Sequence, residues 1–186
     1  MGKITRVKPA KLVIGFIFKD EEVFQKVKGI LIRKFGKIDF ESRVMPFNFT
    51  DYYAEELGDG LKRVFVSFRR LIYPANLSRL KIITNSIEKK LLSGRKRLIN
   101  IDPGYLDLAK LVLASTKDYA HRIYLGKGIF AEITLFFKDN SFRAQEWTYP
   151  DYRTDNYIKI FNKIREIYAD AISPSISKVV PKRISG

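Results

Sequence analysis

The chain opens with an apolar run followed by an amphipathic segment, and this order constrains the fold more than any other feature. The run KLVIGFIF, residues 11–18, is short, branched and aromatic, which predicts a largely buried strand. Asp20 stands where a helix N-cap belongs, apolar residues recur at helical spacing over residues 21–35, and Gly36 follows. We therefore predict a buried strand and then an amphipathic helix.

The next four segments extend this pattern. Alternation of apolar and polar residues predicts strands at 37–44 and 62–72. A second helix is expected over residues 77–92, followed by an apolar strand at 97–101. The order strand, helix, strand, strand, helix, strand is that of the split βαβ unit of ferredoxin-like folds, which we expect for the first half of the chain.

The second half adds further elements and completes one α+β domain. They are a helix at 106–115, a hairpin within residues 122–137 with its tip at 126–128, a strand at 142–147 and a last helix at 155–172. We expect a mainly antiparallel sheet with helices packed on it and a single domain over residues 1–172. Residues 173–186 mix proline, serine and basic residues without periodicity, which predicts a mobile tail.

Composition limits the chemistry that the chain can perform. The 186 residues are 46% hydrophobic, enough for one core, and they include no cysteine. The lack of cysteine excludes disulfides, thiolate zinc sites, iron–sulfur clusters and cysteine nucleophiles. No apolar run approaches the roughly 20 residues of a membrane span, and the N-terminus lacks the apolar centre of a signal peptide. We therefore expect a cytoplasmic protein that does not associate with membranes.

The formal net charge of +15 has two interpretations. It would attract polyanions such as RNA, and the basic stretch KKLLSGRKR, residues 89–97, would be the contact surface for a phosphate backbone. A chain rich in lysine, arginine, isoleucine and glutamate is also typical of thermophile-like proteins. The basic stretch could equally be a helix C-terminus whose cations compensate the helix dipole.

The segment INIDPGYL, residues 99–106, is the most specific local indication of a turn or a ligand site in the sequence. Asp102, Pro103 and Gly104 fit a type II turn, in which proline presets φ and glycine supplies a positive φ. A strand that ends in such a turn and opens a helix also exposes N–H groups that suit a phosphate. Asp102 would then be a metal or hydroxyl ligand at the end of the strand.

The segment STKDYAHRIYL, residues 115–125, contains the only histidine of the chain. His121 either caps a turn after the helix or exchanges protons, since imidazole titrates near neutrality. Lys117 and Arg122 either neutralise the helix dipole or bind phosphate. Glu132, within FAEITL, is either an edge position or a ligand.

Two aromatic segments are further candidates. In NFTDYY, residues 48–53, Thr50 or Asp51 can cap a helix, but two tyrosines beside a carboxylate can also hold a base or a sugar. In EWTYPDYR, residues 146–153, a turn at proline is one interpretation. The other is a binding loop, because Tyr149, two further aromatic rings and an arginine are groups that hold planar rings and anions.

Familiar signature motifs are absent from the sequence. It contains no GxxxxGK[ST] P-loop, no GxGxxG after a strand, no HExxH and no GxSxG.

Four segments together carry a resemblance. FTDYY, NIDPGYL, KLVLASTKDYAHRIYLGKGIFAEITL and WTYPDY resemble the prokaryotic domain-of-unknown-function 4416 family, from about residue 11 to residue 172. Members are often labelled "GTP-binding protein", although this sequence lacks the P-loop that such a label normally means. The resemblance implies one shared site, composed of Thr50, Asp51, Tyr53, Asp102, Tyr105, Lys117, His121, Arg122, Trp147, Asp151 and Arg153.

These observations lead to two functional hypotheses. The first is a pocket for a nucleotide or other phosphorylated small molecule, with Mg²⁺ as a candidate cofactor. Lys117 and Arg122 would meet phosphate, aromatic rings would stack on the ligand, and His121 and Asp102 would be the catalytic residues. In that case Asp102, His121 and Trp147 should surround one cavity. The alternative is a non-catalytic RNA-binding protein that uses the basic stretch.

Overall fold

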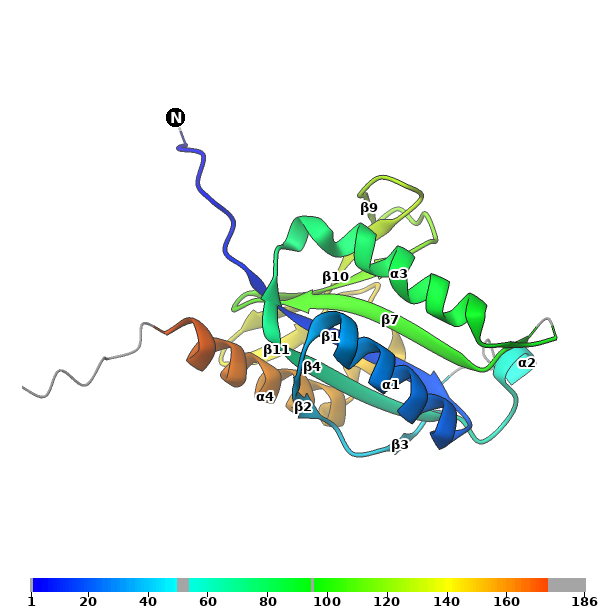
Figure 1. Ribbon diagram of the computed structural model, residues 1–186. Helices are drawn as coiled ribbons and strands as arrows, with labels where there is room; N and C mark the ends of the chain where they lie inside the picture. Colours follow the sequence, from blue (N-terminus) through cyan, green and yellow to red (C-terminus); the bar gives the residue numbers. More distant parts are fainter. Residues whose placement is uncertain (1, 50–53, 95, 174–186) are drawn as a thin grey trace, which may run out of the picture.

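The computed structural model describes residues 2–49, 54–94 and 96–173, which form a large sheet with helices on both faces (Figure 1). In chain order the elements are β1 (Ala10–Phe18), α1 (Glu21–Phe35), β2 (Ile38–Glu41), β3 (Met45–Pro46), α2 (Ala54–Leu57), β4 (Lys62–Ile72), η2 (Pro74–Asn76), α3 (Leu77–Lys90), β5 (Leu92–Ser93), β6 (Lys96–Arg97), β7 (Ile99–Leu106), β8 (Lys110–Ser115), β9 (Ile123–Tyr124), β10 (Phe130–Lys138), β11 (Ser141–Ala144), η3 (Pro150–Arg153) and α4 (Asp155–Ile172).

The strand order in the main sheet is β11-β10-β8-β7-β1-β4-β2, and every pairing is antiparallel. In the first half, β4 lies between β1 and β2, and β7 lies on the other side of β1. This arrangement is consistent with the ferredoxin-like unit expected there. The second half extends the same sheet beyond β7. The prediction of an α+β fold with a mainly antiparallel sheet is confirmed.

Strand β1 is central, and all nine of its residues are buried. Alternate side chains therefore enter two separate cores. Leu12, Ile14 and Phe16 pack under α1 and α3, whereas Val13 packs on the opposite face with residues of α4. Figure 1 shows α1 and α3 together on one face and α4 on the other.

The first and last helices have the ends that the sequence predicts. The Asp20 side chain accepts a hydrogen bond from the Glu22 N–H at the start of α1, and Gly36 ends the helix with a φ of 95°. Thr154 caps α4 by accepting from the Tyr157 N–H. No helix in the described residues is both long and apolar enough to cross a membrane.

The helix predicted at residues 106–115 is wrong, because this segment forms the end of β7, a turn and β8. The Asp107 carboxylate accepts hydrogen bonds from the N–H groups of Ala109 and Lys110, which fixes a tight turn in place of a first helical turn. Within β8, Leu111 faces α4 and Val112 faces the opposite side. The leucines fit a helical period, but they belong to an alternating strand.

The type II turn predicted at residues 102–104 is also wrong. Asp102 lies within β7 opposite Gly15 of β1, and Gly104 lies opposite Leu113 of β8. A Cβ atom at Gly104 would be 2.5 Å from the Val112 carbonyl oxygen. Glycine is needed at this position because the two strands approach closely there, and the turn lies five residues further along the chain.

The remaining boundaries differ by a few residues or lie outside the described part. The hairpin tip is confirmed, with a positive φ at Gly126, Lys127 and Gly128. The strand expected at 142–147 is the shorter β11. The tail expected at 173–186 falls outside the described residues except for Ser173.

Candidate functional site

The sheet opens between β7 and β8. These strands pair only from Gly104 to Leu106 of β7, so the first half of β7 has no strand on that side. There the Ile101 N–H donates to Glu88 Oε1 at 2.6 Å, and the Ile101 carbonyl oxygen accepts from Lys81 Nζ at 3.1 Å. Pro103, two residues on, would direct its N–H to the same side but has none. Side chains of α3 therefore replace a strand at this edge.

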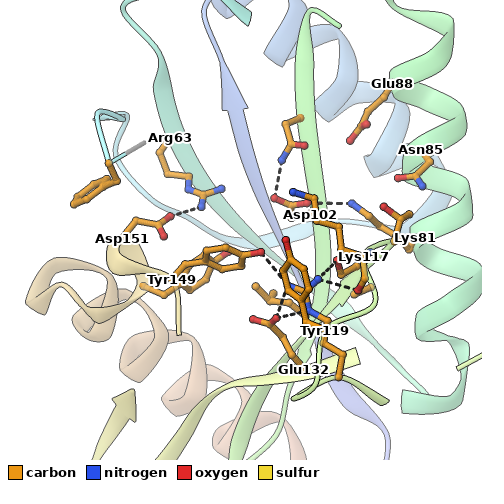
Figure 2. A pocket seen from close by; sticks show the side chains of 18 of the residues that line it. Arg63, Lys81, Asn85, Glu88, Asp102, Lys117, Tyr119, Glu132, Tyr149 and Asp151 are labelled. Atoms are coloured by element: carbon orange, nitrogen blue, oxygen red, sulfur yellow. Dashed lines mark hydrogen bonds and ion pairs between the residues drawn. The ribbon is translucent and has the colours of Figure 1, made fainter. Parts of the chain in front are cut away.

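A cavity of about 660 Å³ occupies this end of the sheet (Figure 2). Its walls come from α3, the starts of β4 and β7, the end of β8, the loop that follows β8, and η3. Its charged lining consists of six cationic side chains and four carboxylates: Arg63, Lys81, Lys89, Arg97, Lys117 and Arg122, and Glu88, Asp102, Glu132 and Asp151. Among the lining residues that the structure describes, cations therefore exceed anions by two.

Arg63 is a buried cation of the cavity, with 2% of its surface exposed. Its Nη2 donates to Asp151 Oδ2 at 2.6 Å, while Nε and Nη1 have no partner among the described residues. The guanidinium carbon lies 4.9 Å from the centre of the Phe65 ring and 5.3 Å from that of Tyr152. Burial opposes the charge, but the neighbouring Tyr152 and Asp151 raise the pKa of Arg63, so the side chain is cationic.

Asp102 lies in the centre of Figure 2, between the cations of two elements. Its carboxylate accepts from Lys81 Nζ at 3.0 Å and from Asn100 Nδ2 at 2.6 Å. Burial alone would raise the pKa of Asp102, yet the positive charges of Lys81 and Arg63 outweigh it and lower that pKa. The carboxylate is therefore ionised and accepts hydrogen bonds at neutral pH.

Glu88 has the opposite balance, since burial raises its pKa more than the Lys81 charge lowers it. We therefore expect opposite effects of two substitutions on stability in acid. A depressed pKa, as at Asp102, adds stability above its unfolded value near 4 that is lost as the pH falls through the folded value. A raised pKa, as at Glu88, means that the folded state binds the proton more tightly, so the free energy of unfolding rises as the pH falls through that pKa.

Asp102→Asn should accordingly flatten the loss of stability between about pH 5 and pH 2, and Glu88→Gln should steepen it. Urea denaturation at a series of pH values measures both slopes. Two slopes that change in the same direction would contradict this account of the two carboxyl groups.

Arg122 organises the loop on the other side of the cavity. Its guanidinium donates to Glu132 Oε2 at 2.8 Å, to Ser115 Oγ at 2.7 Å and to the Tyr149 hydroxyl at 2.9 Å. It also lies 4.5 Å from the centre of the Tyr119 ring. Arg122 therefore holds two tyrosines at the mouth, and the helix that it was expected to neutralise is a strand.

His121 and Trp147 lie together but do not line the cavity. Their rings stack with centroids 5.4 Å apart and an angle of 10° between the planes. His121 Nε2 is 3.3 Å from Glu132 Oε2, and Glu132 does line the cavity. The expectation that Asp102, His121 and Trp147 surround one cavity is therefore met by Asp102 alone.

The site residues predicted from the sequence fall into three groups. Asp102, Lys117, Arg122, Tyr149 and Asp151 line the cavity. Tyr105 instead packs on the opposite face of the sheet, and Arg153 donates to the carbonyl oxygens of Thr148 and Glu146 within its own loop. Thr50, Asp51 and Tyr53 lie outside the described residues.

Sequence reasoning missed several lining residues, chiefly Arg63, Lys81, Asn85, Glu88 and Asn100. Two signals could have found some of them. Arg63 alternates in phase with Phe65 and so had to share its face of the sheet. Lys81 and Glu88 lie two turns apart on the same side of the predicted helix as Leu77 and Ile87, which places two charges on the face that packs on the sheet.

The basic stretch divides between the cavity and the surface. Lys89 and Arg97 line the cavity, whereas Lys90 and Lys96 are exposed elsewhere. Arg97 also forms ion pairs with Glu56 and Glu88. In the described part of the chain, no three histidine, aspartate or glutamate side chains are placed to hold a metal ion.

Comparison with known proteins gives one relationship. No curated protein and no solved structure matches the chain. Residues 8–168 match the family described as "Domain of unknown function (DUF4416)", which covers the sheet, the cavity lining and most of α4. The chain therefore belongs to the DUF4416 family.

Proposed function

We propose that the cavity binds a nucleotide or another phosphorylated small molecule. The observation that carries this proposal is the excess of cationic over acidic side chains around one enclosed space. A phosphate group is the common small-molecule anion that such a lining attracts. Arg63 adds a buried positive charge to this lining.

The size and the aromatic groups of the cavity support the same class of ligand. A volume of about 660 Å³ falls within the range of roughly 300–1,000 Å³ of small-molecule sites. Tyr119 and Tyr149, both held by Arg122, present rings at the mouth that can stack on a base. A divalent ion such as Mg²⁺ would depend on phosphate oxygens of the ligand for part of its coordination.

RNA binding is the less favoured alternative. Lys89 and Arg97, two cations of the basic stretch, contribute to a concave lining, whereas a phosphate backbone needs cations along an open surface. An open groove for a single strand would also present a row of stacking rings. The cavity instead favours a ligand of limited size.

The experiment that tests the proposal is calorimetric titration with nucleoside monophosphates, nucleoside triphosphates, sugar phosphates and inorganic phosphate, each with and without Mg²⁺. At least one phosphorylated compound should bind and raise the melting temperature. A ligand at 100 times its dissociation constant would add about 2.7 kcal/mol to the free energy of unfolding. Failure of every phosphorylated compound to bind would overturn the proposal.

A pair of neighbouring lysines supplies a matched test. Lys89 lines the cavity and Lys90 does not, although both are exposed in the last turn of α3. Lys89→Gln should weaken binding of the phosphorylated ligand about three- to tenfold, because one cation near the phosphate is lost. Lys90→Gln removes the same charge from the same helix and should leave the dissociation constant unchanged. Equal effects would indicate only a loss of general electrostatic attraction.

A further inference from the structure

The inner part of the cavity differs from its mouth in charge. Its three cations each have a carboxylate: Arg63 pairs with Asp151 at 2.6 Å, Lys81 with Asp102 at 3.0 Å, and Arg97 with Glu88 at 3.0 Å. Lys89, at the exposed end of α3, has no ion pair in the described part of the protein. A phosphate at the floor would meet as many carboxylates as cations, so the balance of charge favours phosphate near Lys89.

The floor also offers both donors and acceptors that remain unused. Lys81 uses two of its three N–H groups among the described residues. The Asp102 oxygens accept one hydrogen bond each there, which leaves lone pairs. Asn85 points into the cavity and has no hydrogen-bond partner among the described residues. A ligand group that can both donate and accept hydrogen bonds at several adjacent atoms matches these donors and acceptors.

The backbone leaves room for the Arg63 guanidinium at this end of the sheet. Gly15 lies opposite Asp102 in the centre of the sheet, and it has no positive φ that would require glycine. A Cβ atom there would lie 3.0 Å from the Phe65 ring and 3.3 Å from Arg63 Nη1. Every other residue of β1 has a side chain, so the missing one makes space for the Arg63 guanidinium on the floor.

We infer that the floor of the cavity binds a hydroxyl-bearing, sugar-like part of the ligand, while its phosphate lies beside Lys89. This inference rests on the proposed function and adds an orientation and a ligand class to it. Vicinal hydroxyls donate to Asp102 and accept from Asn85 and Lys81, whereas the dianion of a phosphate ester has no O–H to donate. Carboxylate, amide and ammonium groups around ring hydroxyls thus account for a floor that is polar yet charge-balanced.

The test compares ribose 5-phosphate with butyl phosphate and inorganic phosphate by calorimetric titration of the full chain. The two organic compounds carry the same phosphate, but only the first has hydroxyls for the floor. Ribose 5-phosphate should bind at least tenfold more tightly than butyl phosphate, because two or more additional hydrogen bonds form.

Three variants test whether residues on the floor cause the difference in affinity between ribose 5-phosphate and butyl phosphate. Asn85→Ala should weaken ribose 5-phosphate binding about fivefold and leave butyl phosphate binding unchanged, while Ser86→Ala, at an exposed neighbour outside the lining, should change neither. Alanine is favourable in a helix, so these two variants should fold. Asp102→Asn, which keeps the shape of the side chain, should abolish most of the preference for ribose 5-phosphate.

The outcomes separate this inference from the proposed function. Equal binding of ribose 5-phosphate and butyl phosphate would overturn the inference and leave a phosphate-binding cavity. Loss of inorganic phosphate binding in Asn85→Ala but not in Lys89→Gln, or tighter phosphate binding in Asp102→Asn, would place the phosphate on the floor and also overturn it. Binding of none of the three compounds would contradict the inference, and the wider nucleotide panel then decides the proposed function.

Discussion

Asp151→Ala is expected to lower the free energy of unfolding by about 3–5 kcal/mol, the usual cost of leaving one member of a buried ion pair unpaired. Arg63 is 2% exposed, and two of its nitrogens have no hydrogen-bond partner among the described residues. An arginine keeps its proton in proteins, so Arg63 cannot avoid this cost by becoming neutral. Urea denaturation measures the change.

Two controls test whether burial is the cause. Glu166 pairs with Lys163 at 2.9 Å on the surface of α4, and Glu166→Ala should have no resolvable effect on unfolding. The double variant Arg63→Met with Asp151→Ala removes both charges and should recover much of the lost stability. If Asp151→Ala were as mild as Glu166→Ala, the buried pair would not contribute as its geometry indicates.

Gly104→Ala is expected to cost about 1–3 kcal/mol or more, because the new methyl group would enter space that β8 already fills. Its Cβ would be 2.5 Å from the Val112 carbonyl oxygen and 2.6 Å from Leu113 Cδ2. The first of these atoms belongs to the backbone, so relief requires the two strands to separate. Thermal and urea unfolding should both show the loss.

Gly29→Ala is the matched substitution in a helix. In α1 the nearest atom to the added Cβ is Arg33 Nη1 at 3.7 Å, an ordinary contact. Alanine is favoured over glycine in a helix interior, so this variant should gain about 0.5–1 kcal/mol. The same chemical change should therefore have opposite signs at residues 29 and 104, and a gain at both would disprove the close approach of β7 and β8.

The parts of the fold that were predicted correctly depend on local physics. Residues 21–35 and 155–172 have a clear helical period and a capping residue, and neither requires knowledge of a distant partner. The hairpin tip at residues 126–128 was equally predictable from the sequence, because two glycines there allow a positive φ. Such features are encoded within a few positions of one another.

The wrong predictions arose where two local interpretations competed. Asp102, Pro103 and Gly104 have the composition of a turn, but β1 on one side and α3 on the other keep the segment extended. The actual turn is made by Asp107, whose neighbours suggested a helix. Tertiary contacts decided between these possibilities, and a single sequence does not reveal which contacts form.

The candidate site was predictable only in part, for a similar reason. Asp102, Lys117 and Arg122 stood out because polar residues cluster around them. Arg63 and Glu88 lie in a strand and a helix that look ordinary in isolation, and only the fold brings them to the same cavity. His121 was predicted as a site residue because it is the sole histidine, but its ring stacks on Trp147, and neither residue lines the cavity.

The missing strand partner along the first half of β7 has a consequence for how the protein responds to a ligand. Lys81 and Glu88 hold the Ile101 backbone and also line the cavity, so the same side chains maintain the sheet edge and would meet the proposed ligand. A ligand that draws on either side chain must change the cohesion of β7 with α3. By linkage, a change in that cohesion must alter ligand affinity by the same factor. Ligand binding in the cavity and the attachment of β7 to α3 would therefore be thermodynamically coupled.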